Sequence, residues 1–217
     1  MKIAVLGTGM VGTTMATRLV ALGHDVVLGE RAEKAEHAGV RPDTAVPGAG
    51  RGSFARAAAH GDLLVNATRG TASIAVLRSV SAHDLAGKVL IDIANPLEFG
   101  DDGFALLTIV NTDSLGERIQ RTFPTLKVVK TLNTMGAALQ TAPQLLAAPT
   151  NVFLGGDHPD AKAQVRELLI SLGWSDEHII DLGGIATARA TEMFGTLGFA
   201  LSTTLGTPLF NIRVEHV

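Results

Sequence analysis

The sequence predicts an α/β protein with a doubly wound, mostly parallel sheet, helices on both faces and a C-terminal helical segment. Three observations support this fold. A short apolar strand, residues 3–6, runs directly into the glycine-rich turn GTGMVG at residues 7–12. Stretches with strand and helix character then alternate along the chain. The strand at residues 88–94, KVLIDIA, is almost continuously apolar, as parallel strands buried on both faces are.

Each predicted element follows from local signals. The first helix, residues 13–22, has helical spacing of its apolar residues, and Gly23 ends it. Ser53 can cap a short helix over residues 54–60, whereas residues 39–52 contain glycine and proline and are expected to form a loop and a helix end. The other strands are expected at residues 26–28, 63–67, 127–132, 151–154 and 179–182. The other helices are expected at residues 73–80, 115–121, 161–172 and 185–205.

Composition narrows the possible functions. The 217 residues are 46% hydrophobic and 18% charged, which suits one large α/β domain with a small appendage. The net charge of −3 argues against a nucleic-acid or anionic-membrane partner. Cysteine is absent from the sequence, which excludes disulfides, thiol catalysis and thiolate metal sites. The first apolar run is too short for a signal peptide, so we expect a cytoplasmic protein.

The glycine-rich turn predicts a dinucleotide-binding site. Gly7 permits a tight turn, Gly9 lets the backbone approach a pyrophosphate, and Gly12 lets the following helix pack closely on the strand. The free N–H groups and the positive end of that helix then face the phosphates. The alternative is an ordinary strand-to-helix turn. We expect the whole turn to bind the cofactor: Gly7, Thr8, Gly9, Met10, Val11 and Gly12.

The end of the second strand should select the dinucleotide. A carboxylate at this place binds a ribose 2′-hydroxyl, as in NAD, and a nearby arginine binds the 2′-phosphate of NADP. The chain offers both signals, because Glu30 favours NAD and the cations Arg31 and Lys34 favour NADP. We predict NADP over NAD, since two cations outweigh one carboxylate and an arginine can also stack on adenine.

The sequence resembles a known family, the NADP-dependent oxidoreductases that use the deazaflavin coenzyme F420. This family also includes the NADPH-binding domains of membrane metalloreductases. The resemblance spans essentially the whole chain and rests on the segments KIAVLGTGMVG, LGHDVVLGERAEKA, GKVLIDIANPL, KVVKTLNTMGA, NVFLGGDHPDAK and DLGGIATARATE. Arg31 matches the family's arginine for the 2′-phosphate, while Glu30 stands where family members usually carry serine. The resemblance therefore implies an NADP-linked reductase with a Rossmann-type domain.

Loops that follow the later strands gain candidate roles from this resemblance. It implies that Ala67, Thr68 and Arg69 lie near the nicotinamide ribose or diphosphate, although Ala67 would equally suit strand-end packing. Ala94, Asn95 and Pro96 form a second candidate cofactor loop, in which Asn95 either binds the carboxamide or caps its own turn. Asn133 and Thr134 are expected to contact the second, hydride-accepting molecule. Basic side chains that would suit its acidic tail are Arg69, Lys130 and Arg189.

The residues indicate a reaction that depends on positioning. We identify no catalytic acid or base, and the seven histidines show no metal-ligand spacing, so no metal site is expected. Hydride transfer between a nicotinamide and a flavin-like ring needs aligned ring carbons more than a general base. The predicted function is therefore NADP(H)-dependent hydride transfer to or from a deazaflavin (F420) or flavin-like acceptor. The alternative is a non-catalytic NADP(H)-binding sensor or partner subunit. The acceptor and the physiological direction stay open.

The chain is expected to divide into an NADP-binding Rossmann-type domain over residues 1–183 and a C-terminal helical segment over residues 184–217. Residues 193–212 carry no charged side chain, and their length approaches that of a membrane span. Several threonines, glycines and a proline dilute their apolar character. We expect a buried or subunit-interface helix, no membrane contact, and a homodimer formed through this segment.

Overall fold

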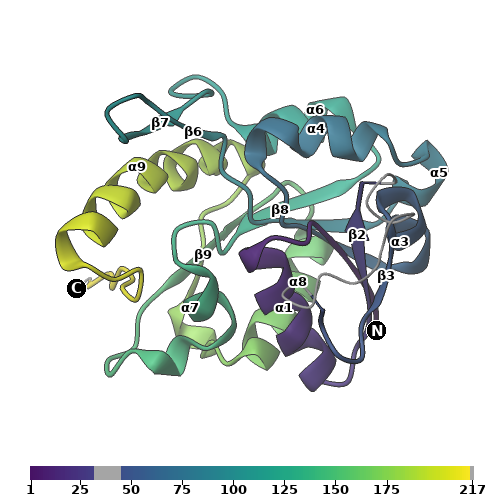
Figure 1. The fold of residues 1–217 in the computed structure, drawn as a ribbon, viewed down its shortest axis with the longest axis horizontal. Coiled ribbons are helices and arrows are strands. Elements are labelled where there is room, and N and C mark those ends of the chain that lie inside the picture. Colours follow the sequence, from purple (N-terminus) through teal and green to yellow (C-terminus); the bar gives the residue numbers. More distant parts are fainter. Residues whose placement is uncertain (32–44, 216–217) are drawn as a thin grey trace.

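The computed structural model describes residues 1–31 and 45–215, and it confirms the doubly wound α/β fold (Figure 1). The described strands form a sheet in the order β10-β9-β8-β5-β4-β1-β2-β3. Neighbouring strands in it are parallel, apart from the antiparallel pair β8 and β9. The strands of this sheet are β1 (Lys2–Leu6), β2 (Asp25–Glu30), β3 (Gly50–Ser53), β4 (Leu63–Asn66), β5 (Val89–Asp92), β8 (Lys127–Thr131), β9 (Val152–Gly155) and β10 (Ile179–Asp181).

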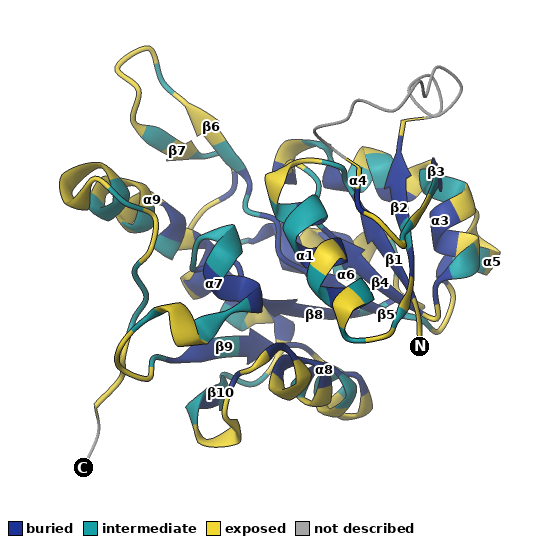
Figure 2. Ribbon diagram, turned by 60° about the horizontal axis from the view of Figure 1, so that its bottom comes forward, coloured by how far each residue is buried: buried dark blue, intermediate teal, exposed yellow. Residues whose placement is uncertain are grey.

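Helices cover both faces of the sheet (Figures 1 and 2). One face carries α1 (Met10–Ala21) and α8 (Pro159–Leu172), with α7 (Ala137–Thr141) against α1. The other face carries α3 (Phe54–His60), α4 (Gly70–Arg78), α5 (Ala82–Leu85) and α6 (Leu115–Thr122). The long helix α9 (Ala188–Leu205) packs against α6 and extends beyond the end of the sheet. Short 3-10 helices lie at Pro143–Leu145, Asp176–His178 and Ile185–Thr187.

Alternation along the central strands builds two separate hydrophobic cores. In β1, Ile3 and Val5 face α1 and α8, whereas Ala4 and Leu6 face α3 and α4. All four side chains are fully buried. Successive side chains of a strand point to opposite faces, so a strand covered on both sides must be apolar at every position. This arrangement explains why residues 3–6 of β1 are apolar without interruption.

The strand order places a switch point beside β1. From β1 the chain runs to β2 and β3 on one side and to β4, β5 and β8 on the other. The loops that follow β1 and β4 therefore leave the sheet in opposite directions and open a crevice at its carboxyl edge. The glycine-rich turn and residues 67–69 lie at this edge.

Three elements differ from the sequence-based prediction. Residues 50–52, expected within a loop or helix end, form β3 together with Ser53, which also caps α3 as expected. Strand β3 pairs with β2 through backbone hydrogen bonds, and its sequence GRGS carries no apolar signal. A hairpin of β6 (Leu97–Phe99) and β7 (Ala105–Leu107) follows β5 and was not predicted, because its short strands are only partly buried. The predicted helix from residue 185 begins as a 3-10 turn and becomes α-helical at Ala188.

The final helix keeps part of its apolar surface exposed. Leu197 and Leu205 of α9 are more than half exposed, and the exposed fractions of Met193 and Phe199 are 40% and 43%. Within residues 1–31 and 45–215, no helix combines the length and the apolar character needed to cross a membrane.

Candidate active site

The glycine-rich turn joins β1 to α1 in a conformation that only small residues permit. Gly7 has φ +121°, and a Cβ atom there would come within 2.5 Å of the Ala67 carbonyl oxygen. A Cβ atom at Gly12 would overlap the Gly7 carbonyl oxygen. At Gly9, in contrast, a Cβ atom would meet no described atom within 4 Å. The first N–H groups of a helix have no partner inside it, so the turn presents α1's positive end to an open approach.

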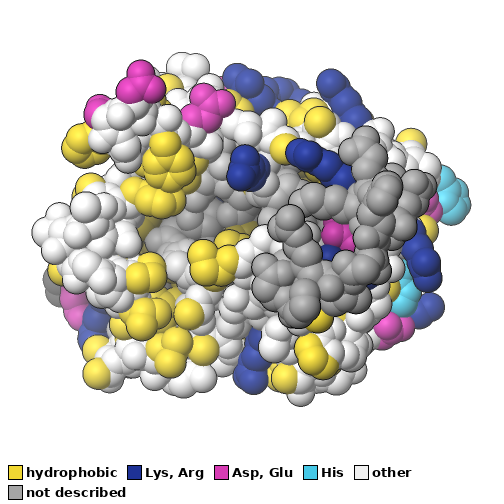
Figure 3. Space-filling view, viewed as in Figure 1, with side chains coloured by type: hydrophobic (Ala, Val, Ile, Leu, Met, Phe, Trp, Pro, Cys, Tyr) yellow, Lys and Arg dark blue, Asp and Glu magenta, His cyan; other side chains and the backbone are white. Residues whose placement is uncertain are grey.

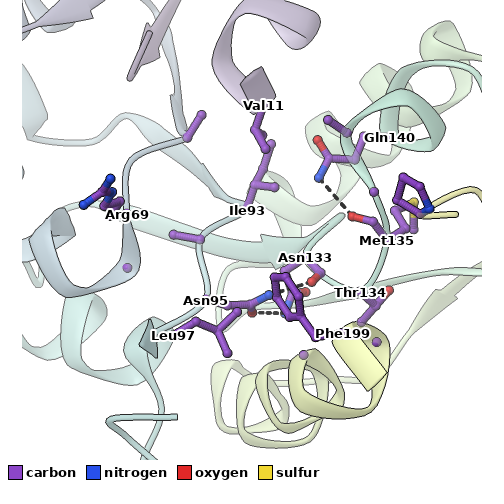
Figure 4. A pocket seen from close by; sticks show the side chains of 18 of the residues that line it. Val11, Arg69, Ile93, Asn95, Leu97, Asn133, Thr134, Met135, Gln140 and Phe199 are labelled. Atoms are coloured by element: carbon purple, nitrogen blue, oxygen red, sulfur yellow. Dashed lines mark hydrogen bonds between the residues drawn. The ribbon is translucent and has the colours of Figure 1, made fainter. Parts of the chain in front are cut away.

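A cleft of about 830 Å³ lies beside this turn (Figure 3). One side, here called the nucleotide wall, consists of Met10, Val11, residues 67–71 and Ala94. The opposite side, here called the acceptor wall, consists of Phe99 in the hairpin, Phe194 and Phe199 in α9, and Phe210 in the C-terminal tail. Asn95, Asn133 and Thr134 lie between them (Figure 4). The cleft thus separates the loops of the parallel sheet from the C-terminal segment.

The predicted site residues fall into three groups. Nine of them line the cleft: Met10, Val11, Ala67, Thr68, Arg69, Ala94, Asn95, Asn133 and Thr134. Gly7, Thr8, Gly9 and Gly12 complete the turn next to it, and Pro96 follows Asn95. Glu30 and Arg31 lie apart, at the end of β2, and Lys34 is outside the described residues. Sequence reasoning missed the aromatic acceptor wall, because its side chains come from segments distant in sequence.

Asn95 and Asn133 hold two loops of the cleft together. The Asn95 side-chain amide donates to the Asn133 carbonyl oxygen at 2.7 Å, and the Asn133 amide donates to Asn95 Oδ1 at 2.9 Å (Figure 4). The Asn95 side chain therefore bonds across the cleft floor instead of capping its own turn. Leu132, just before Asn133, has φ +61°, which is costly for a bulky residue. Gln140 stabilises this backbone by donating to the Leu132 carbonyl oxygen at 3.0 Å.

A second network fixes the loop after β4. Buried Asn66 donates to Ser73 Oγ at 3.0 Å and to Asp92 Oδ1 at 2.8 Å. Its own oxygen accepts from the Thr68 hydroxyl at 2.7 Å. Gly70 begins α4 so close to the neighbouring loop that a Cβ atom would overlap the Asn95 carbonyl oxygen. The loops after β4 and β5 consequently occupy fixed positions relative to each other.

A buried charge cluster lies beneath the cleft floor. Lys130 Nζ is 2.8 Å from Asp92 Oδ2 and 2.9 Å from Glu192 Oε1, and all three side chains are at most 1% exposed. Lys130 also donates to the Ala94 carbonyl oxygen. Burial by itself lowers the pKa of Lys130, but the Asp92 and Glu192 carboxylates raise it above its ordinary value. Lys130 is therefore a cation that fixes the position of the Ala94 loop. Asp92 fixes the same loop, because its Oδ1 atom accepts a hydrogen bond from the Ala94 N–H at 3.3 Å.

Glu192 is the member of this cluster that lies on α9. Its two carboxylate oxygens accept from the backbone N–H groups of Leu115 at 2.8 Å and Gly116 at 3.0 Å, at the start of α6. A carboxylate at a helix N-terminus satisfies otherwise unpaired donors and complements the helix dipole. The cluster therefore links the cofactor loop of the sheet to the helix that supplies the acceptor wall.

The basic residues expected near the acceptor separate in the structure. Arg69 is exposed and lines the cleft. Lys130 is buried in the charge cluster, and Arg189 pairs with Glu117 through its Nε atom at 2.8 Å, so neither lines the cleft. In the described part of the chain, no group of histidines and carboxylates could hold a metal ion.

The acceptor wall is aromatic and only partly covered. Phe99 and Phe199 form an edge-to-face pair with ring centroids 5.2 Å apart and planes at 87°. Phe99 is 60% exposed and Phe199 is 43% exposed. Among the described residues that line the cleft, Arg69 and Glu98 alone carry charge. An apolar, ring-lined surface opposite strand-end loops that carry Thr68, Arg69 and Thr71 suits a planar molecule with a polar edge.

Comparison with known proteins identifies relatives of this chain. Residues 2–96 match the family described as coenzyme F420-dependent NADP oxidoreductase. The crystal structure of a proposed F420-dependent NADP reductase from Arthrobacter sp. FB24 is 49% identical, covers 100% of both chains and superposes with a TM-score of 0.93. Metalloreductase STEAP3 of Rattus norvegicus is 31% identical over 192 residues, which are 88% of this chain. The match covers only 36% of that metalloreductase.

More distant structures share the fold alone. An imine reductase from Aspergillus terreus is 20% identical, with a TM-score of 0.63 over 94% of this chain and 63% of that chain. The Arthrobacter structure, at 49% identity over the whole of both chains, is far more similar than these. Together with the glycine turn and the cleft, it shows that this chain belongs to the family of coenzyme F420-dependent NADP oxidoreductases and is an NADP-linked oxidoreductase.

Proposed function

We propose that the protein transfers a hydride between NADP(H) and a deazaflavin (F420) or flavin-like ring that binds in the cleft. The observation that carries this proposal is the cleft itself, in which strand-end loops that carry Thr68, Arg69 and Thr71 face an aromatic wall. Its described lining contains no histidine, and its two charged side chains, Arg69 and Glu98, are exposed. Such a lining suits a reaction governed by the alignment of two rings rather than by proton transfer.

The residues present fit a dinucleotide. Gly9 leaves the approach to α1 open, where a pyrophosphate would meet backbone N–H groups. Gln140 lines the cleft and is 2% exposed, yet its Oε1 atom has no hydrogen-bond partner within the described residues. A buried acceptor without a donor is costly, and a ligand N–H group such as that of a carboxamide would satisfy it.

Within this proposal each loop has a role. The turn at residues 7–12 holds the pyrophosphate, and Arg31 with Lys34 holds the 2′-phosphate. Residues 67–69 and 94–96 flank the nicotinamide ribose and ring. When bound, NADPH supplies the hydride. Asn133 and Thr134 contact the acceptor, and the phenyl groups of the acceptor wall shield it from water.

A spectrophotometric titration tests the acceptor. We expect the protein to oxidise NADPH with the deazaflavin and to respond less to riboflavin, which lacks an acidic tail. The exposed Arg69 is the cleft residue suited to that tail, so Arg69→Gln should raise the KM for the deazaflavin and leave that for riboflavin unchanged. Arg78→Gln, in the last turn of α4, is the matched control, because Arg69 lies just before the first residue of that helix.

Two other outcomes would change the proposal. Turnover with a quinone or another small electrophile, without turnover of either flavin, would replace the acceptor and keep the reductase. NADPH binding without turnover against the whole panel would favour the alternative, a non-catalytic NADP(H)-binding sensor or partner subunit. The lack of charged groups deep in the cleft is compatible with that second function too.

We also propose that residues 1–183 form the nucleotide-binding domain and that residues 184–217 mediate a homodimer. The exposed apolar side chains of α9 and of the hairpin support this assembly, since a second copy would cover them: Met193, Leu197, Phe199, Leu205, Phe99 and Leu106. Sedimentation equilibrium at micromolar concentration is expected to give twice the chain mass. A monomer under these conditions would contradict the dimer.

A further inference from the structure

The end of β2 holds a carboxylate where NADP-binding sites usually avoid one. Glu30 is the last residue of β2 and is only 5% exposed. A free carboxylate at this position would accept a hydrogen bond from a ribose 2′-hydroxyl and would repel a 2′-phosphate. The neighbouring strand changes this situation. Arg51 Nη2 lies 2.9 Å from Glu30 Oε2 in a salt bridge.

The register of β2 and β3 brings these two side chains together. Leu28 pairs with Arg51 and Glu30 pairs with Ser53 in parallel register. Residues two apart on a strand point to the same face, so Glu30 and Arg51 share a face of the sheet. The opposite face at Gly29 is occupied by Phe54 and Ala57 of α3.

We propose that Arg51 is a residue that determines nucleotide specificity, because it neutralises Glu30 and so makes the end of β2 compatible with a 2′-phosphate. This inference rests on the proposed NADP(H) binding and deepens it. The salt bridge engages Glu30 Oε2, while the other oxygen, Oε1, is buried and has no hydrogen-bond partner among the described residues. Arg31, which is exposed next to it, then supplies positive charge. The Arg51 side chain is itself 21% exposed.

Electrostatics makes the effect selective. A 2′-phosphate carries negative charge and a 2′-hydroxyl carries none, so freeing the Glu30 carboxylate penalises NADPH alone. Two like charges near a protein surface interact by one to a few kcal/mol, which corresponds to about tenfold or more in affinity. The same carboxylate, once free, gains a hydrogen-bond donor in the 2′-hydroxyl of NADH.

Nucleotide affinities, measured by calorimetry without any acceptor, test this proposal. In Arg51→Met we expect NADPH binding to weaken about tenfold or more, with NADH binding unchanged or tighter. The double variant Arg51→Met with Glu30→Gln should recover most of the lost NADPH affinity, because the repelling charge is gone. Arg51→Lys, which keeps the cation, should retain most of the preference for NADPH. Arg78→Met removes a surface cation from α4 and should leave both affinities unchanged.

The ratio of the two affinities separates specificity from damage to the fold. Equal weakening of NADPH and NADH in Arg51→Met, or no recovery in the double variant, would overturn the proposal. If Arg51→Met does not fold, Glu30→Gln alone decides: weaker NADH binding would show that Glu30 reads the 2′-hydroxyl after all. A parent protein that binds neither nucleotide, or prefers NADH, would instead refute the proposed function before any variant is made.

Discussion

The two walls of the cleft are built on different physical principles. The nucleotide wall is made of backbone turns whose spacing depends on glycines, and its Thr68 side chain is held by hydrogen bonds to Asn66 and Ser73. The acceptor wall is made of phenyl groups on α9, the hairpin and the C-terminal tail, and these are partly exposed. A wall set by backbone contacts tolerates little change, whereas an apolar wall can accept different rings at small cost. The comparison suggests that the acceptor varies more easily than the nucleotide.

The buried cluster of Lys130, Asp92 and Glu192 connects the walls. Lys130 binds the loop that carries Ala94 on one side and the α9 carboxylate on the other. A variant meant to affect one wall alone must therefore leave this cluster intact. We expect substitutions in the nucleotide wall, in the cluster and in the acceptor wall to have effects of decreasing size.

The largest effect is expected in the nucleotide wall. Gly12→Ala places a Cβ atom against the Gly7 carbonyl oxygen, a backbone atom that cannot move away. We expect about 3 kcal/mol less unfolding free energy and no measurable NADPH binding. Gly9→Ala is the matched variant, since its Cβ atom meets nothing described within 4 Å. It should unfold like the parent in urea yet lose NADPH affinity, and parent-like affinity would show that no pyrophosphate lies there.

Breaking the connection between the walls should cost a similar amount of unfolding free energy. Lys130→Met leaves Asp92 and Glu192 buried without a cation, which typically costs about 3–5 kcal/mol before the protein relaxes. Adding Asp92→Asn and Glu192→Gln to Lys130→Met should restore part of this loss in urea unfolding. The pKa of Lys130 is raised in the folded protein, so its contribution persists at neutral pH and disappears as the pH rises through that pKa. A variant as stable as its parent would refute a charged Lys130.

The acceptor wall should respond more weakly and with only a small loss of stability. Phe199→Ala removes one ring of the edge-to-face pair with Phe99, which is worth about 0.5–1.5 kcal/mol. We expect the KM for the acceptor to rise by up to about tenfold, while NADPH affinity stays unchanged. Phe104→Ala is the control, because Phe104 is 66% exposed and does not line the cleft. Equal losses of NADPH and acceptor binding would mean that the walls are not independent.

The smallest effect is expected where α9 is attached to α6 at the surface. Hydrogen bonds from Arg189 hold the pKa of Glu117 below its ordinary value. The stability that this pair contributes is therefore present above the unfolded-state pKa of Glu117 and is lost as the pH falls through its folded-state pKa. Arg189→Gln should lower the unfolding midpoint slightly at neutral pH and not at all in acid. A difference that grew on acidification would contradict this account of the pair.

Local signals were sufficient for the central fold but not for its edges. The apolar strands and the glycine turn were predicted because each is encoded within a few residues. Strand β3 was missed because GRGS pairs through its backbone and buries few apolar atoms. The antiparallel direction of β9 was not predicted either, since a four-residue apolar segment reads the same in both directions.

The candidate site divides in the same way. The sequence by itself determined the glycine turn, the loops after β4, β5 and β8, and the ambiguity at Glu30 and Arg31, because these follow directly from strand ends. The three-dimensional structure was needed to show that Arg51 pairs with Glu30, that Lys130 is buried beside Asp92 and Glu192, and that phenyl groups form the opposite wall. Glu30 and Arg51 are 21 positions apart in the sequence, and Lys130 and Glu192 are 62 positions apart. Local spacing carries no information about contacts over such distances.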